Sequence, residues 1–135
     1  MKIIHKIAAV VVENNKFLVV HKVDSPIWTS LGGKPEAGET EEEALLREVK
    51  EEFDCECSIV KKLGDFEAKA GEDEAIVRLS TFLVDLIGDY KLSDPELDDY
   101  KFIDKDYKEE GIKMPASLVD QVIPYCIKEG ILNWE

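Results

Sequence analysis

Three glutamates in the window from Gly33 to Cys55 constrain this chain more than any other feature of its sequence. Glu48, Glu51 and Glu52 are spaced i, i+3 and i+4, so on a helix of about 3.6 residues per turn they share one face. Carboxylates at these spacings repel one another and destabilise the helix, so a compensating interaction is expected. A hard divalent cation is the best candidate, because Mg²⁺ and Mn²⁺ prefer oxygen ligands.

A solvated acidic face is the alternative interpretation of these glutamates. It suits Glu41, Glu42 and Glu43, which fall in the first turn of the predicted helix, where the helix dipole favours carboxylates. The three later glutamates lie beyond the reach of that dipole. A capping box formed by Thr40 and Glu43 predicts a helix that continues through about Phe53.

Composition limits the kind of protein this can be. A chain of 135 residues supports one core, so residues 1–135 are predicted to form a single domain. The formal net charge of −13 argues against a nucleic-acid polymer as partner, because such binding requires clustered Lys and Arg. A small phosphorylated ligand is compatible with this charge if metal ions neutralise both partners.

The apolar run over residues 7–12 is too short to span a membrane and is predicted to be a first strand rather than a signal peptide. Three cysteines without a secretion signal indicate reduced thiols and a cytoplasmic location.

Alternation and helical spacing predict an α+β domain. Two β-branched runs on either side of Glu13-Asn14-Asn15 indicate a hairpin. A terminal helix is expected over residues 117–128, and Pro124 should break or kink it near its middle. The expected strands cover residues 6–12, 16–22, 28–31, 57–63, 75–87 and 100–103. Strands of mixed type around one central and one terminal helix are typical of the α+β class.

The window from Gly33 to Cys55 resembles the Nudix box, G-x5-E-x7-R-E-U-x-E-E-x-G-U, where U is a bulky aliphatic residue. The matching residues are Gly33, Glu39, Arg47, Glu48, Val49, Glu51 and Glu52. Two positions differ, because Asp54 replaces the final glycine and Cys55 replaces the last aliphatic residue. Asp adopts the left-handed conformation more readily than most residues, so we expect the helix-ending turn and the activity to be retained. The resemblance implies the Nudix fold, an α/β/α sandwich around a mixed β-sheet.

The resemblance also implies a metal site. In the family these glutamates hold Mg²⁺, which Mn²⁺ can replace, and the metal bridges the pyrophosphate of the substrate. By position, Glu48 and Glu52 are the principal ligands, Glu51 ligates directly or through water, and the carbonyl of Gly32 completes the site. Glu48 is also the candidate for orienting or deprotonating the attacking water.

Arg47 has three interpretations. The resemblance implies that it bonds Glu39 and the loop backbone and so braces the glutamate helix against the glycine turn. A planar guanidinium suits such bracing better than an ammonium. The alternatives are an ordinary helical pair with Glu51 or Glu43, and a direct contact with substrate phosphate.

The segment from Asp94 to Phe102 resembles the E-x5-aromatic segment that many Nudix proteins carry before a late strand. It makes Glu96 a candidate for an additional metal ligand or an alternative base. An exposed acidic loop is the other interpretation of this segment.

Substrate recognition is less constrained by the sequence. The segment WTSLGG, which begins at Trp28, is similar to the W-x-x-P-G-G of MutT-like nucleotide hydrolases, with Leu31 at the usual proline. Trp28 is a candidate for stacking on a base, although a core position is its alternative. The basic candidates for phosphate contacts are Lys22, Lys34 and Arg78.

The predicted function is Mg²⁺-dependent hydrolysis of a pyrophosphate bond in a nucleoside diphosphate linked to another group. Features that mark ADP-ribose and dinucleoside polyphosphate hydrolases are absent, which favours a nucleoside triphosphate. The alternatives are an ADP-ribose or nucleotide-sugar pyrophosphatase, a non-catalytic nucleotide-binding module and a purely structural acidic protein. No membrane partner is expected. Analogy with the family also suggests a homodimer, with strand edges and the tail over residues 131–134 as the candidate contacts.

Overall fold

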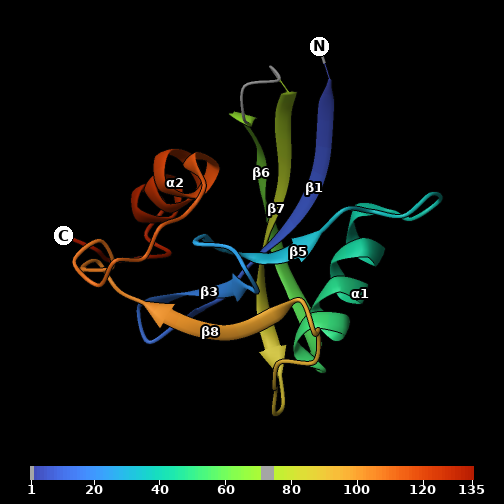
Figure 1. Ribbon diagram of the computed structural model, residues 1–135, viewed down its shortest axis with the longest axis horizontal. Coiled ribbons are helices and arrows are strands. Elements are labelled where there is room, and N and C mark those ends of the chain that lie inside the picture. Colours follow the sequence, from blue (N-terminus) through green and yellow to red (C-terminus); the bar gives the residue numbers. More distant parts are fainter. Residues whose placement is uncertain (1, 71–74) are drawn as a thin grey trace.

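Two β-sheets and two helical regions make up this computed structural model, which describes residues 2–70 and 75–135 (Figure 1). The elements in chain order are β1 (Ile3–Val10), β2 (Val12–Glu13), β3 (Lys16–Lys22), β4 (Trp28–Thr29), β5 (Leu31–Gly33), α1 (Glu41–Phe53), β6 (Glu56–Ala70), β7 (Ala75–Ile87), β8 (Leu97–Ile103), η1 (Ser117–Val122) and α2 (Ile123–Lys128). Within the described ranges, no helix has the length and apolar character that crossing a bilayer requires.

The larger sheet is mixed and has the strand order β5–β1–β7–β6. Its central pair, β1 and β7, is parallel, and the outer pairs are antiparallel. The second sheet contains β2, β3 and β4, and β8 pairs with the other edge of β3. Val11 lies between β1 and β2, so the chain passes from one sheet to the other at this residue.

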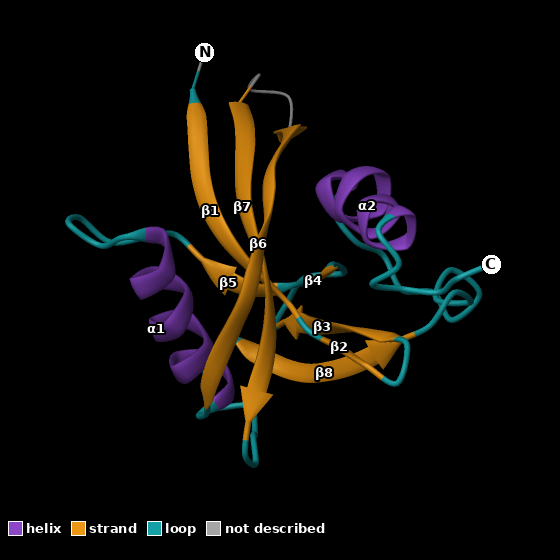
Figure 2. Ribbon diagram, turned by 180° about the vertical axis from the view of Figure 1, so that it is seen from behind, coloured by secondary structure: helices purple, strands orange, loops and turns teal. Residues whose placement is uncertain are grey.

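Strand β1 contributes side chains to two cores, because successive residues of a strand point to opposite faces. Ile7 and Ala9 pack in the core that includes the buried side of α1, whereas Ala8 and Val10 pack in the core that includes η1 and α2. Figure 2 shows α1 and α2 on opposite sides of the sheets. The predicted α+β class and the α/β/α arrangement around a mixed sheet are therefore confirmed.

Helix α1 begins and ends where the sequence predicts. The Thr40 hydroxyl accepts a hydrogen bond from the backbone N–H of Glu43 at 3.1 Å, and the Glu43 carboxylate accepts one from the N–H of Thr40 at 2.9 Å. At the other end, Asp54 has φ 50° and ψ 40°, and its N–H donates to the carbonyl of Lys50. The left-handed turn is thus formed without the glycine that the family pattern places here.

Replacing Asp54 by glycine is expected to raise the free energy of unfolding by about 0.5–1 kcal/mol, because glycine adopts positive φ without steric strain. Asp54→Ala should change stability in the opposite direction, since alanine disfavours this conformation. Urea denaturation of both variants tests the sign of each effect. A lower stability for Asp54→Gly than for the wild type would contradict this interpretation of the turn.

The terminal helix is irregular for a reason visible in its sequence. Residues 117–122 form a π-helical segment, and the N–H of Ile123 donates to the carbonyl of Leu118. Pro124 then lies in the first turn of the α-helical part, α2. A proline ring clashes with the carbonyl four residues earlier in an α-helix, and a wider preceding turn relieves that clash. The predicted break near the middle of this helix is therefore confirmed.

Several strand boundaries differ from the predicted ones, and three of these differences affect the fold. The hairpin turn is present, with positive φ at Asn14 and Asn15, but β3 pairs with β2 while β1 joins the other sheet. Strand β6 extends from Glu56 to Ala70, well beyond the predicted residues, because register shifts within it keep a long pairing with β7. Gly32 and Gly33, which lie beyond the predicted strand over residues 28–31, pair with β1 as part of β5.

The C-terminal tail packs on its own chain, and a contact of residues 131–134 with a partner stays a prediction. Leu132 is buried in the core beside α2. The Trp134 indole donates a hydrogen bond to the carbonyl of Asn15 at 2.8 Å, and the N–H of Asn133 donates to the Asn15 side chain at 2.7 Å. These contacts tie the tail to the turn between β2 and β3.

Candidate active site

Strand β5 places its glycine backbone directly against β1 and α1. A Cβ atom at Gly32 would lie 1.9 Å from the carbonyl oxygen of Ile7, and one at Gly33 would lie 2.7 Å from the Glu48 carboxylate. The φ of Gly32 is +138°, which side-chain-bearing residues rarely adopt. Glycine at these two positions therefore allows β1, β5 and the glutamates of α1 to approach one another closely.

Glu52 is the most buried carboxylate of this region, with a relative exposure of 6%. Its Oε1 accepts a hydrogen bond of 2.7 Å from the N–H of Gly32. Burial raises the pKa of Glu52 to about 8, and the neighbouring carboxylates of Glu48 and Asp94 add to that effect. The fold thus holds a carboxyl group in a place where its ionised form requires a nearby cation.

Glu48 and Glu51 are turned toward Arg47. The Glu48 Oε1 accepts from the Arg47 Nη1 at 2.9 Å, and the more exposed Glu51 accepts from the same nitrogen at 3.2 Å. Burial raises the pKa of Glu48, and Arg47 acts in the opposite direction. The glutamates of the predicted site therefore lie on one side of α1, but they differ in burial and in hydrogen-bond partner.

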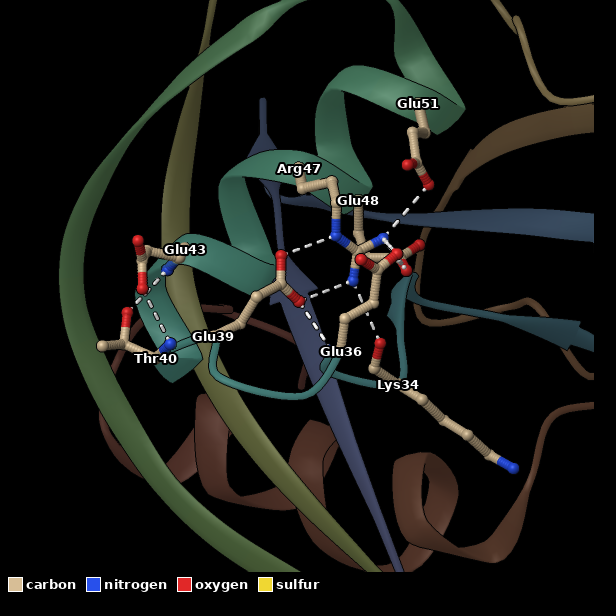
Figure 3. A network of polar contacts seen from close by, with 8 residues as sticks. All are labelled: Lys34, Glu36, Glu39, Thr40, Glu43, Arg47, Glu48 and Glu51. Atoms are coloured by element: carbon tan, nitrogen blue, oxygen red, sulfur yellow. Dashed lines mark hydrogen bonds and ion pairs between the residues drawn. The ribbon is translucent and has the colours of Figure 1, made fainter.

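Arg47 is the centre of the polar network in Figure 3. Its Nε and Nη2 donate to the two oxygens of Glu39 at 2.7 and 2.9 Å, and Nη2 also donates to the carbonyl of Lys34 at 3.1 Å. The Glu39 carboxylate in turn accepts from the N–H of Glu36 at 2.7 Å. Hydrogen bonding to Glu39 raises the pKa of Arg47 above its usual range. Arg47 therefore makes the contacts with Glu39 and the loop backbone that bracing of the helix requires, and it also forms the helical pair with Glu51.

Replacing Arg47 by lysine is expected to lower kcat by about 10–100-fold, the usual effect of losing a side chain that orients metal ligands. Lysine keeps the charge but cannot bond both Glu39 oxygens and the Lys34 carbonyl together. Steady-state kinetics on the best substrate measures this effect. Arg78→Lys is the matched comparison, because Arg78 forms its ion pair with Glu67. An equal loss of kcat in both variants would contradict a specific bracing role for Arg47.

The carboxylates suit a hard divalent cation, although they do not already enclose one. Among the described residues, no three Asp, Glu, His or Cys side chains converge closely enough to hold a metal ion. Glu52 forms no ion pair with any described Lys, Arg or His side chain. The nearby donors are carboxylate and carbonyl oxygens, the ligands that Mg²⁺ and Mn²⁺ prefer. Glu48 bonds Arg47 through Oε1, so its Oε2 could ligate such an ion while that bond is kept.

Two adjoining pockets lie beside these carboxylates, and they differ in chemistry. The first, here called the apolar pocket, has a volume of about 300 Å³. Its distinctive lining residues are Ile27, Leu79 and Pro115, together with the hydroxyl-bearing Ser25, Thr29 and Ser30. The second, here called the charged pocket, has a volume of about 340 Å³. Its distinctive lining residues are Lys34, Glu36, Arg47, Glu48, Asp94 and Glu96.

Both pockets share Lys6, Lys22, Gly32, Gly33 and Glu52 in their lining. This shared boundary contains the buried Glu52 carboxylate and Gly32, whose N–H donates a hydrogen bond to it. An elongated molecule can therefore lie with an uncharged part in the apolar pocket and an anionic part in the charged pocket.

Of the residues predicted to bind substrate, Lys22 and Lys34 line the charged pocket, whereas Trp28 and Arg78 line neither pocket. Trp28 is half-buried and packs at 4.9 Å from the ring of His21, while its neighbours Ile27 and Thr29 line the apolar pocket. Arg78 lies on the opposite face of β7 from Leu79, as strand alternation requires. The structure thus does not bring Trp28 or Arg78 to the candidate site.

Glu96 lines the charged pocket on an exposed segment before β8. The carboxylate of Asp94 lies in the same pocket, and its charge helps to raise the pKa values of both Glu48 and Glu52. Asp94 also accepts a hydrogen bond of 2.8 Å from the N–H of Glu96. The predicted role of Glu96 stays a prediction, and Asp94 is a further carboxylate of the site that the sequence did not single out.

Lys6 is the other pocket residue that the sequence analysis missed. A lysine within the apolar run of β1 is the signal that could have identified it, because a charged residue in a central strand requires a polar environment. Pro115 and Leu79 carried no comparable signal, since their contribution depends on how distant segments pack.

The NUDIX domain family matches residues 4–110 of this chain. A Bacillus subtilis (strain 168) protein named "Putative 8-oxo-dGTP diphosphatase" is 34% identical over 62 residues, which are 46% of this chain and 42% of that protein. The match therefore spans less than half the length of this relative.

Two solved structures illustrate the similarity in fold. The MutT protein from Methanosarcina mazei Go1 has a TM-score of 0.77 at 21% identity, and the match covers 95% of this chain and 96% of that one. An ADP-ribose pyrophosphatase from Streptococcus suis 89-1591 has a TM-score of 0.62 at 19% identity, with 76% and 74% covered. At these identities the two structures establish a shared fold alone.

Proposed function

Because the chain belongs to the Nudix hydrolase family, we propose that this pyrophosphohydrolase cleaves nucleoside triphosphates to a monophosphate and pyrophosphate. The observation that carries the proposal is the pair of adjoining pockets with Glu52 at their boundary. The apolar pocket suits an uncharged nucleoside, and the charged pocket suits a polyphosphate chain. The relative named for 8-oxo-dGTP diphosphatase activity supports a triphosphate substrate.

The residues that would hold Mg²⁺ or Mn²⁺ are Glu48, Glu51, Glu52 and the carbonyl of Gly32, with Glu96 as a further candidate. When bound, such an ion withdraws charge from phosphorus and lowers the pKa of a coordinated water. Arg47 and Glu39 fix α1 against the loop that follows β5, so that the carboxylates keep their positions. Lys22 and Lys34 neutralise phosphate oxygens in the charged pocket.

The reaction is a hydrolysis in which water attacks a phosphorus of the triphosphate chain. The new P–O bond forms as the bond to the bridging oxygen breaks, and that oxygen leaves with the other phosphate fragment. Glu48 orients the water and accepts one of its protons, because its carboxylate lies at the charged pocket beside Gly33. The ammonium groups of Lys22 and Lys34 stabilise the charge that develops on the leaving fragment.

A phosphate-release screen with Mg²⁺ tests the proposal on canonical and oxidised nucleoside triphosphates, ADP-ribose, nucleotide sugars and dinucleoside polyphosphates. Cleavage of a triphosphate to monophosphate and pyrophosphate gives a signal only when inorganic pyrophosphatase is added. Cleavage of ADP-ribose gives a signal only when a phosphomonoesterase is added. The matched negative control for each substrate contains EDTA during the reaction. This protein is then removed, and excess Mg²⁺ is added together with the coupling enzyme, because the coupling enzymes need metal ions themselves.

A triphosphate that dominates the screen, and whose cleavage EDTA abolishes, would support the proposal. A preference for ADP-ribose or a nucleotide sugar would favour the second candidate, an ADP-ribose or nucleotide-sugar pyrophosphatase. Turnover of none of these substrates, with nucleotide binding retained, would favour a binding module. The cytoplasmic location and the homodimer stay predictions.

A further inference from the structure

Three lysines line the two pockets, and two of them lie where the pockets join. Lys6 comes from β1, Lys22 from β3 and Lys34 from the segment after β5. Lys6 and Lys22 line both pockets, and Lys34 lines the charged pocket. None of the three forms an ion pair with a carboxylate of the described residues, although the chain has 30 acidic residues and only 17 Lys and Arg.

Lys6 occupies an unfavourable position for a free ammonium group. Its side chain belongs to a partly buried residue of the central strand β1. Burial lowers the pKa of Lys6, and the positive charges of Lys22 and Lys34 lower it further. An anion bound between these ammonium groups would remove both penalties, so the cluster suits an anionic ligand.

The pocket chemistry specifies which part of a nucleotide would lie beside Lys6. This step rests on the proposed function, in which the nucleoside occupies the apolar pocket and the remaining phosphates occupy the charged pocket. The phosphate that is bonded to the nucleoside must then lie at the boundary between the pockets. Lys6 and Lys22 are the cationic residues of that boundary.

We propose that Lys6 binds the phosphate group attached to the nucleoside and thereby selects nucleoside 5′-phosphates over polyphosphates that lack a nucleoside. Lys6 is then a specificity-determining residue. Lys34, which does not line the apolar pocket, contacts the more distant phosphates. The ammonium of Lys6 reads a phosphate that every nucleotide carries, so its contribution does not depend on the base.

The test compares the binding of two product-like ligands by isothermal titration calorimetry in buffer with Mg²⁺. The ligands are inorganic pyrophosphate and a panel of AMP, GMP, CMP and UMP. Lys6→Met, which keeps the length of the side chain but removes its charge, should raise the Kd of each monophosphate by about tenfold or more. The Kd of pyrophosphate should change by less than about threefold, because its phosphates lie beside Lys34. Lys6→Arg should restore monophosphate binding.

Lys61→Met is the matched control, because Lys61 is an exposed residue of β6 that lines neither pocket. It removes the same charge and should leave both Kd values unchanged. Thermal unfolding checks that each variant is folded. Lys6→Met should unfold at or above the wild-type temperature, since a partly buried charge has been removed.

Several results would overturn the proposal. Equal weakening of monophosphate and pyrophosphate binding would indicate only a general effect of charge. A loss confined to one base of the panel would indicate that Lys6 contacts that base instead of the phosphate. Unchanged monophosphate binding in Lys6→Met would refute the role of Lys6 while leaving the proposed function intact. If the wild type itself binds none of the monophosphates, the proposed nucleotide function fails as well.

Discussion

Replacing Glu52 by glutamine is expected to lower kcat by at least about a thousandfold, because a metal ligand that stabilises the transition state is worth several kcal/mol. Glutamine has nearly the same shape and can still accept the hydrogen bond that Gly32 donates at 2.7 Å. It lacks the negative charge that would hold the cation. Steady-state kinetics over a range of Mg²⁺ concentrations measures the loss, and added metal should not restore the rate.

The stability of the metal-free Glu52→Gln variant should not fall with its activity. In the absence of metal, the folded wild type must keep Glu52 in a site where burial raises its pKa to about 8. A neutral amide avoids the cost of burying that charge, so the metal-free variant should unfold at an equal or higher urea concentration. Lower activity with unchanged or higher stability would separate a metal-binding role from a packing role.

Glu42→Gln is the matched control on the same helix. Glu42 is exposed in the first turn of α1 and lines neither pocket, so the loss of its charge should leave kcat unchanged. Activity of Glu52→Gln within about tenfold of the wild type would contradict the assignment of Glu52 as a principal metal ligand.

Helix α1 and its glutamates could be predicted because their signals are local. The capping box of Thr40 and Glu43 defines where the helix begins, and the i, i+3, i+4 spacing places the glutamates on one face. The turn at Asp54 follows from the conformational preference of a single residue. None of these inferences requires knowledge of which strands pair.

The two pockets could not be predicted, because they depend on contacts between distant segments. The apolar pocket combines Ile27 after β3, Leu79 on β7 and Pro115 before η1, which lie far apart in the sequence. Trp28 was the candidate for base stacking on the basis of its residue type. Because β4 pairs with β3, the neighbours of Trp28 line the apolar pocket, whereas Trp28 itself packs beside His21.

Replacing Gly32 by alanine is expected to lower the free energy of unfolding by more than about 4 kcal/mol, a loss that few single substitutions cause. A Cβ atom here would lie 1.9 Å from the carbonyl oxygen of Ile7 and 3.1 Å from the Cα of Ala8. These are backbone atoms of the paired strand, so no rotamer change can relieve the clash. Strand β5 would have to separate from β1, and the hydrogen bond from the Gly32 N–H to Glu52 would be lost with it.

Gly38→Ala is the matched control, because Gly38 has φ +84° in the loop between β5 and α1, and a Cβ atom there would have no described atom within 4 Å beyond its chain neighbours. That variant tests the conformational cost alone, which should be about 1–2 kcal/mol. Urea denaturation of both variants separates the steric contribution from the conformational one. Equal losses would show that close approach of β5 to β1 does not require glycine at position 32. A much larger loss for Gly32→Ala would show that the close approach of β5 to β1 requires glycine at position 32, where the backbone N–H also bonds Glu52.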